Sequence, residues 1–494
     1  ELQLADQRFR IRGSQPVHPA IVHIDIDTDA LKAEGNWGTW NAGRHAIAVN
    51  ILRRLGVKAL GVDIFFTERG ERLFAVNKLK NSGRANFSLE DIERIVPDSS
   101  RLFVDAMSNS GFVVLSQLFE NQPLHERYGF YRENRSNSLR LQDGRFRVAL
   151  PQVFPHLRAQ SNITPVLAEY AVAAAGTGIA QVDPDTDGVV RRAPLFFLLG
   201  NHVYPSLGLA TALVARGLTL ADLAPGTSRR EIVFSRGTNL LRIPVRRDGS
   251  LYVNWRGGVA DAHPRISWSA IKWLGYGMVL REMKAVANRV GEDTLFDRER
   301  FLQLPEIELL QREFGDGTPL AGPLAIRAED RDSVPIVEEV WSRLVVATLL
   351  QKMLDENPAL KIEEFCSKTG LDDTPGVREF FFGMKYASII MRDPRLVGSV
   401  LSKGEARRLA VEDMKLFEEY RLLIGNERPD SGERPWFFYP APLVESLKGP
   451  LYGSWLNGKI CLYGLTASGT HDLNPVPMAS RYPMVGVHAT VADN

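Results

Sequence analysis

The sequence predicts an α/β protein with layered architecture, a largely parallel central sheet, an added antiparallel hairpin and a long helical insertion. Short apolar runs occur at 21–27 (IVHIDID), 59–66 (ALGVDIFF) and 459–465 (KICLYGL). Runs of this length, bounded by Gly, Pro and Asp, are typical of strands buried on both faces. A helical pattern at 41–55 separates the first two runs and gives a strand–helix–strand unit. Between about 267 and 434 helical periods dominate, which predicts the insertion.

The remaining elements of the first half follow in chain order. A helix is expected at 99–110 and a third strand at 112–118, whereas 120–160 is expected to be rich in loops. Thr164-Pro165 is a typical helix start and predicts a helix that ends near Ala175. The runs at 179–182 and 189–199 flank D-P-D-T-D-G and predict the antiparallel hairpin.

Beyond the hairpin, the sequence predicts one helix and three short strands, followed by helices of the insertion. Tyr204-Pro205-Ser206 begins a helix that reaches about Arg216. The predicted strands lie at 232–235, 241–245 and 251–255, and the clearest helices of the insertion lie at 336–354 and 405–423.

Charge and composition exclude several classes of protein. The 60 Lys and Arg residues balance 59 Asp and Glu residues, so nothing favours nucleic acid as a partner. No apolar run approaches the roughly 20 residues of a membrane span, and the chain as given is expected to be soluble, without a signal segment. Cys366 and Cys461 are expected to be buried free thiols, because two cysteines make neither a disulfide framework nor a zinc site.

Three carboxylates mark a candidate ligand crevice. Asp25, Asp27 and Asp63 follow two strands predicted to be neighbours, and open α/β sheets bind ligands outside the carboxyl ends of their strands. Such carboxylates can hold Mg²⁺ or Ca²⁺. The favoured alternative is that they cap the following helices and pair with Arg44, which comes after Trp37 and also suits a carboxylate ligand.

A second acidic group resembles half of a calcium loop. Asp183, Asp185 and Asp187 have the spacing of calcium ligands, but Pro194 occupies the twelfth position, where a bidentate Glu is needed. A tight acidic turn followed by Arg191 and Arg192 is therefore the better interpretation.

The turn after the last apolar run contributes the remaining candidates. Residues 464–469 resemble a phosphate-binding turn, with Thr466, Ser468 and the later Asp472 as ligand-binding candidates. The Lys-Ser/Thr of a P-loop is missing. No H-E-x-x-H or G-x-S-x-G pattern occurs, so the sequence predicts no catalytic residue, no metal ligand set and no cofactor.

Four separated motifs carry a family resemblance. These are I-D-I-D with W-x-x-W-x-x-x-R and G-V-x-A-L-G-V-D-I-F-F; D-T-D-G-V-V-R-R-A-P-L with V-Y-P-S-L-G-L-A; G-K-I-C-L-Y-G-L-T-A-S-G-T-H-D; and V-G-V-H-A-T-V-A-D-N. In this order they resemble the type-two cyclase- and histidine-kinase-associated sensory extracellular domain. The resemblance covers roughly residues 1–270 and 435–494. It implies a membrane-proximal segment at 1–20, a sensory α/β domain at 21–270 and 435–494, and an insertion at 271–434 that ordinary members lack.

The resemblance also implies a function. The chain would be the extracytoplasmic part, periplasmic or at the cell surface, of a homodimeric membrane receptor whose spanning helices lie outside the given sequence. A small molecule or protein stimulus would control a cytoplasmic adenylate or guanylate cyclase or a kinase. Two other hypotheses stay open: a free-standing periplasmic binding protein or enzyme that uses the acidic crevice, and an insertion that docks another protein.

Overall fold

The computed structural model describes residues 2–67, 98–120, 129–149, 157–224, 227–258, 263–315, 336–392, 453–467 and 473–494, apart from 158, 161 and 229. Contacts divide the chain into two units. We call residues 1–71, 99–271 and 456–494 the α/β unit, and residues 72–98 and 272–455 the helical unit. The domain limits expected from the sequence stay a prediction, and the one at 435 lies outside the described residues.

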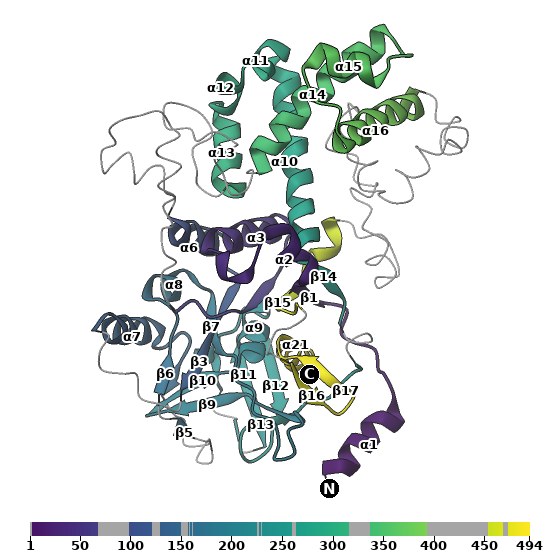
Figure 1. Ribbon diagram of the computed structural model, residues 1–494. Helices are drawn as coiled ribbons and strands as arrows, with labels where there is room; N and C mark the ends of the chain where they lie inside the picture. Colours follow the sequence, from purple (N-terminus) through teal and green to yellow (C-terminus); the bar gives the residue numbers. More distant parts are fainter. Residues whose placement is uncertain are drawn as a thin grey trace. The chain divides into compact units, whose positions relative to one another are not determined.

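A mostly parallel sheet forms the centre of the α/β unit and confirms the predicted fold class (Figure 1). Its order is β14 (Arg265–Ser267), β1 (Ile21–Ile26), β15 (Ile460–Leu465), β2 (Ala59–Asp63) and β3 (Val113–Glu120), with all neighbours parallel. β3 also pairs with β7 (Gly176–Ile179), in parallel, and with β6 (Asn162–Thr164), antiparallel. The residues of β1 are all buried, as an internal strand covered on both faces requires.

Helices cover both faces of this sheet. Tyr463 of β15 bonds to His45 of α3 (Ala42–Arg54), which packs with α6 (Ser99–Ser110). The preceding residue, Leu462, packs instead against Val485 of α21 (Val485–Asp493), beside α9 (Leu207–Ala215). Because successive strand residues point to opposite faces, α3 and α6 lie on one face, and α9 and α21 on the other.

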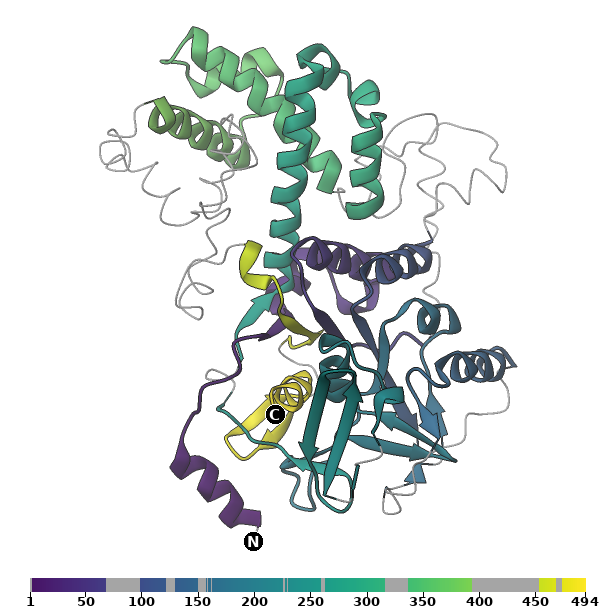
Figure 2. The ribbon, with the colours of Figure 1, turned by 180° about the vertical axis from the view of Figure 1, so that it is seen from behind.

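Smaller sheets surround the α9–α21 face. Figures 1 and 2 both show the hairpin of β16 (Leu473–Val476) and β17 (Ala479–Pro483) beside α21. The other strands are β4 (Val148–Ala149), β10 (His202–Pro205), β9 (Phe196–Leu199) and β5 (Ala159–Gln160) in one sheet, β11 (Glu231–Arg236) with β12 (Asn239–Pro244), and β13 (Ser250–Tyr252) with β8 (Arg192–Pro194). Their apolar side chains join those of α9 and α21 in one core cluster that includes Trp255 and Tyr482.

The remaining helices complete the two units. In the α/β unit they are α1 (Leu2–Arg12), α2 (Thr28–Glu34), α7 (Gly129–Gln142), α8 (Ala168–Ala173) and the 3₁₀ turns η1 (Trp37–Thr39) and η2 (Leu220–Asp222). α10 (Trp268–Val290) leads into the helical unit, which contains α11 (Glu292–Phe296), α12 (Arg298–Leu302), α13 (Pro305–Phe314), α14 (Ile336–Glu356), α15 (Ile362–Thr369) and α16 (Pro375–Arg392). The 3₁₀ turn η5 (Gly453–Leu456) precedes β15. None of the described helices has the length and apolar character needed to cross a bilayer.

Helices with a local start signal are predicted well. Asn41 caps α3 by accepting a hydrogen bond from the backbone N of Arg44 at 3.3 Å. Ser206 caps α9 in the same way, through the backbone N of Leu209 at 3.4 Å. α6 has the expected limits, and α14 contains the predicted 336–354 helix. The predicted helix at 405–423 lies outside the described residues.

Three expectations about the first half are wrong. Thr164 pairs with Leu118 in β6 and therefore does not cap a helix, so α8 begins only at Ala168. The 179–182 and 189–199 runs do not pair, because β7 joins the central sheet while β8 and β9 pair with β13 and β10. The 120–160 segment contains the helix α7 as well as loops.

Glycines allow α21 to lie close to its neighbours. A Cβ on Gly208 of α9 would lie 2.6 Å from the backbone O of His488 and 2.9 Å from Cβ of Val491. A Cβ on Gly464 of β15 would lie 3.0 Å from Cγ2 of Val485. Because glycine has no Cβ at these two positions, α21 can lie close to both α9 and the sheet.

We predict that Gly208→Ala lowers the free energy of unfolding by about 1–3 kcal/mol, because the added methyl group must push α21 away from α9. Urea unfolding monitored by tryptophan fluorescence measures the loss. Gly38→Ala is the matched control, since a Cβ there has nothing within 4 Å. Equal stability of the two variants would contradict the close packing.

Candidate functional site

The carboxylate of Asp25 forms an ion pair with an arginine of the neighbouring strand β14. Arg265 of β14 donates two hydrogen bonds to it, Nε to Oδ2 at 2.6 Å and Nη2 to Oδ1 at 3.0 Å. Burial raises the pKa of Asp25, although Arg265 and a hydrogen bond from Thr466 act in the opposite direction. A bidentate arginine–carboxylate pair is among the stronger charge-assisted interactions. The side chains of Asp25 and Thr466 therefore have structural partners at this edge of the sheet.

Asp27 is a helix cap. Its Oδ1 accepts hydrogen bonds from the backbone N of Ala30 at 2.8 Å and from the hydroxyl of Ser267 at 3.0 Å. The structure therefore shows for Asp27 the capping role expected as the alternative to metal binding.

Asp63 lies apart from the other two acids. The predicted adjacency of β1 and β2 is wrong, because β15 lies between them. Two strand spacings amount to about 10 Å, too far for Asp25 and Asp63 to share one cation. Among the described residues, no three His, Cys, Asp or Glu side chains form a group that could hold a metal ion.

Burial determines the chemistry of Asp63. Its side chain is 9% exposed, and its Oδ2 lies 3.9 Å from Nε2 of His488 on α21. Burial raises the pKa of Asp63 to about 7. The same nitrogen of His488 lies 3.1 Å from the backbone O of Ala180. Among the described residues, Asp63 has no closer cationic partner than His488 to offset its burial.

Trp37 and Arg44 lie on the α3 face of the sheet, opposite the α21 face where Asp63 meets His488. Arg44 hydrogen-bonds to the backbone O of Glu34 and lies 5.4 Å above the Trp40 ring, so its predicted pairing with the acids is wrong. The Trp37 ring lies 6.0 Å from that of His45, which bonds to Tyr463 at 2.9 Å. These residues belong to an aromatic cluster around α3. The other two candidates, Ser468 and Asp472, lie outside the described residues.

The acidic turn is held by arginines. Arg191 is 2% exposed. It donates to Asp6 from Nε and Nη2 at 2.7 Å, to Asp187 at 2.8 Å and to Asp185 at 3.2 Å. The hydrogen bonds from Arg191 lower the pKa of Asp187 to about 2. Arg192 adds a bond to Asp185. These contacts agree with the predicted acidic turn followed by two arginines. They also include Asp6 of α1, a partner of Arg191 that the spacing of the aspartates in the sequence did not reveal.

A largely buried polar cluster lies at the last turn of α21; its members are Asp493, Arg256, His263 and His23, and we call it the polar group under α21. The Asp493 side chain is 1% exposed, and its carboxylate meets Nε of Arg256 at 3.0 Å and Nε2 of His263 at 3.5 Å. It also accepts a bond from the backbone N of His18 at 3.0 Å. Burial alone would raise the pKa of Asp493, but His263 and Arg256 hold this pKa below its usual value.

His23 is the most isolated member of this group. It is fully buried in β1, and neither ring nitrogen has a hydrogen-bond partner among the described residues. Its ring lies 5.8 Å from that of His263. Burial, with Arg265 and His263 nearby, holds the pKa of His23 well below its usual value, so the ring is neutral.

The residues Asn254, Trp255 and Arg256, which we call the 254–256 segment, connect the two terminal regions. On one side Arg12 donates to Oδ1 of Asn254 at 2.6 Å and to the backbone O of Trp255, and the backbone N of Gln15 donates to the backbone O of Arg256 at 2.6 Å. On the other side the backbone N of Asn254 donates to Oδ1 of Asn494 at 2.7 Å, and Arg256 binds Asp493. Both terminal regions are therefore bound to this one segment, and both contact Asn254 and Arg256.

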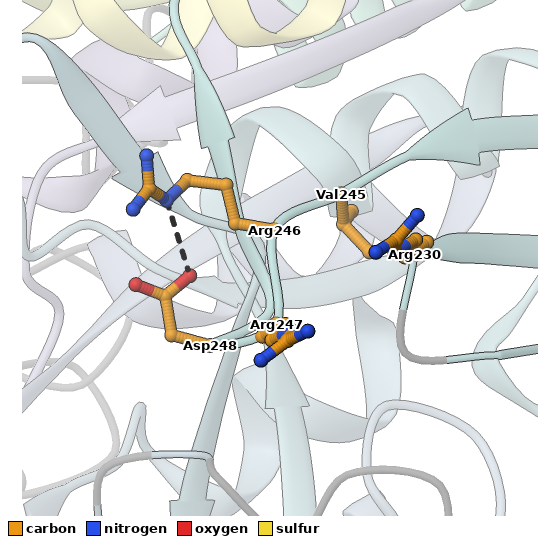
Figure 3. Close-up of a pocket in the computed structure, with 5 residues that line it drawn as sticks. All are labelled: Arg230, Val245, Arg246, Arg247 and Asp248. Carbon is orange, nitrogen blue, oxygen red and sulfur yellow. Dashed lines mark ion pairs between the residues drawn. The ribbon is translucent and has the colours of Figure 1, made fainter.

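A surface hollow of about 510 Å³ lies at the turn between β12 and β13. Figure 3 shows five residues that line it. Arg246 points towards Asp248, with 3.9 Å between Nε and Oδ1, whereas Arg230 and Arg247 lie apart from this pair. Arg230, Arg247 and Asp248 are exposed. The hollow is a charged surface without the converging buried groups that a catalytic site needs.

Comparison with known proteins identifies the family. The sequence profile of the CHASE2 domain matches residues 1–290, more than half of the chain. The chain belongs to the CHASE2 domain family. CHASE2 domains are non-catalytic sensory modules, extracellular or periplasmic, of signalling receptors in the membrane. Searches among curated proteins and among solved structures gave no match.

The polar group under α21 is the part of this CHASE2 domain that sequence reasoning missed. No prediction from the sequence singled out Asp493, His263 or Arg256. The local signal in the sequence is a charged residue, Asp493, in the last turn of an apolar helix that ends in V-A-D-N (491–494). Cys461 is a buried free thiol as expected, whereas Cys366 is only half-buried.

We predict that Asp63→Asn changes how the stability of this CHASE2 domain depends on pH. The folded protein holds the Asp63 proton up to about pH 7, whereas the ordinary pKa is 3.8, so the free energy of unfolding falls as pH rises through that window. The amide cannot ionise. Relative to the parent chain, the variant should therefore gain up to roughly 1.4 kcal/mol per pH unit between these values.

Urea unfolding at a series of pH values measures this difference, and titration of His23 cancels because both chains contain it. Asp29→Asn is the control, since the Asp29 side chain is 80% exposed. A difference between Asp63→Asn and the parent that stays constant across the window would show that burial does not hold the Asp63 proton.

Proposed function

We propose that this chain is the extracytoplasmic sensory part of a membrane receptor that controls a cytoplasmic adenylate or guanylate cyclase or a kinase. Membership of the CHASE2 family gives the class of module. The observation that carries the proposal further is the 254–256 segment, which binds the end of α1, the residue Gln15 after it and the end of α21 at the same time. A change at one terminal region is thereby connected mechanically to the other.

The mechanism is a shift between two arrangements of the terminal regions. A stimulus that binds one arrangement more tightly raises its population by its differential affinity. α21 transmits the change because its apolar side is fixed to the sheet and its last residues are fixed by Arg256 and Asn254. In a homodimer, two copies of α21 would lead towards the membrane and bring two effector domains into or out of register.

The alternative of a periplasmic enzyme receives no support from the acidic crevice. Asp25 is paired with Arg265, Asp27 caps α2, and Asp63 lies two strands away from Asp25, with β15 between them. These carboxylates have structural partners or separate positions and do not converge on a reacting group.

The coding region on both sides of this sequence tests the proposal. We expect a hydrophobic span upstream, one or more spans downstream and then a cyclase or kinase domain. A stop codon shortly after the codon for Asn494, with no spans, would contradict the receptor function.

In the receptor so defined, Asp493→Asn should shift the basal output of the effector by roughly fivefold, since weakening one buried ion pair by about 1 kcal/mol changes a two-state population by that factor. Cyclic nucleotide or phosphorylation is measured in membranes, with Asp29→Asn as the exposed control. Unchanged output of Asp493→Asn at unchanged expression would show that the end of α21 does not transmit the signal.

A further inference from the structure

A cavity of about 200 Å³ lies where α9, α21 and β12 meet the first residues of β1 and β15. Its apolar walls come from six different elements, β13 among them, and include Ile21, Leu209, Leu241, Ile243, Ile460 and Val491. This is the opposite end of the sheet from the acidic crevice, because Ile21 and Ile460 begin their parallel strands. None of the residues singled out from the sequence as ligand candidates lines it.

The volume fits a small apolar group. In another protein a cavity of about 150 Å³ with walls of Leu, Ile and Phe stays dry and takes up benzene. The present cavity has about 200 Å³ and a partly polar lining, so its apolar part has room for one ring or a short alkyl chain.

The polar residues at the cavity indicate the charge of its occupant. His18, Arg216, Arg242, Asp493 and Asn494 complete the lining. Asp493 is already bound to Arg256, and its negative charge is therefore compensated. Arg242 pairs with Glu231 at 2.9 Å but stays 58% exposed, and the exposed Arg216 side chain has no partner among the described residues. Positive charge is in excess.

We propose that this cavity binds a small monocarboxylic acid, with its alkyl or aryl body between α9, β12 and Val491 and its carboxylate at Arg216 and Arg242. A guanidinium group matches a carboxylate with two parallel hydrogen bonds. The size of the cavity limits the body to about six to eight carbons.

This assignment rests on the proposed sensory function and names the chemical class of its stimulus. The cavity is lined by residues 491–494 at the end of α21 and by His18 and Ile21 at the start of β1. A ligand there touches both terminal regions that the 254–256 segment connects. It stabilises the arrangement in which they stay together, and binding energy becomes a population shift of α21.

The test uses the 494-residue chain with hexanoate as the probe and hexan-1-ol as its neutral counterpart. Isothermal titration gives the affinities, and transferred magnetisation between the probe and the methyl groups of Leu209, Ile243 and Val491 gives the location. We expect both probes to bind and hexanoate to bind more tightly. Arg216→Gln should weaken hexanoate about tenfold and leave hexan-1-ol unchanged, and Arg230→Gln, an exposed arginine outside the cavity, should change neither.

Ala212→Phe places a ring in the cavity from α9 and should abolish binding of both probes. Absence of hexanoate binding up to about 10 mM, where the binding free energy is below about 3 kcal/mol in magnitude, would overturn the assignment. So would equal affinity of Arg216→Gln and the parent, or magnetisation transfer to methyl groups elsewhere, such as Ile163. If Ala212→Phe fails to fold, the Arg216→Gln comparison and the methyl contacts decide.

Different results would refute the ligand class of the cavity and the receptor function. A receptor whose output responds to Asp493→Asn, but whose sensory chain binds no hexanoate in this cavity, refutes the ligand class and leaves the receptor function. A coding region without membrane spans or effector refutes the receptor function whatever the cavity binds.

Discussion

The arrangement of the two terminal regions depends on the contacts of one buried carboxylate, that of Asp493. It is almost fully buried and meets Arg256, His263 and the backbone N of His18. A buried carboxylate left without such partners costs several kcal/mol, so these contacts specify where the last turn of α21 lies. The rest of α21 follows, because Gly208 and Gly464 admit it closely on α9 and on the sheet.

This constraint links chain regions that are far apart in the sequence. β15 closes the gap between β1 and β2 more than 390 residues after β2, as the register of Ile460 with Ala59 shows. α21 then covers the face that β15 completes. A module built in this way presents its last helix only when the whole sheet has assembled, which suits a sensory domain whose output must reflect the folded state of the entire unit.

Local signals in the sequence predicted the elements whose determinants are local. Asn41 and Ser206 accept the cap bonds that their positions imply, and the apolar runs at β1, β2 and β15 are buried strands. Thr164 has the same chemistry as a cap, yet the ladder bond opposite Leu118 prevails. The tertiary context overrides a turn preference worth only about 1 kcal/mol.

The site was less predictable because its partners are distant. Arg191 bonds to Asp6 across 185 positions, Arg265 to Asp25 across 240 and Arg256 to Asp493 across 237. Spacing rules work within one element or turn and carry no information about such pairs. The order of the sheet caused the error for Asp25 and Asp63, since a strand-helix-strand unit does not show that a third strand will enter between its two strands.

Hydrogen exchange of the chain carrying Arg256→Gln tests most directly whether the two terminal regions depend on one another. Peptides from residues 14–20 and 485–494 are compared between the variant, the parent and Lys32→Gln, in which an exposed side chain is changed. Loss of the bond to Asp493 should speed exchange in both peptides, because His18 and the end of α21 share that carboxylate. Faster exchange in only one of the two peptides, or in neither, would contradict the coupling.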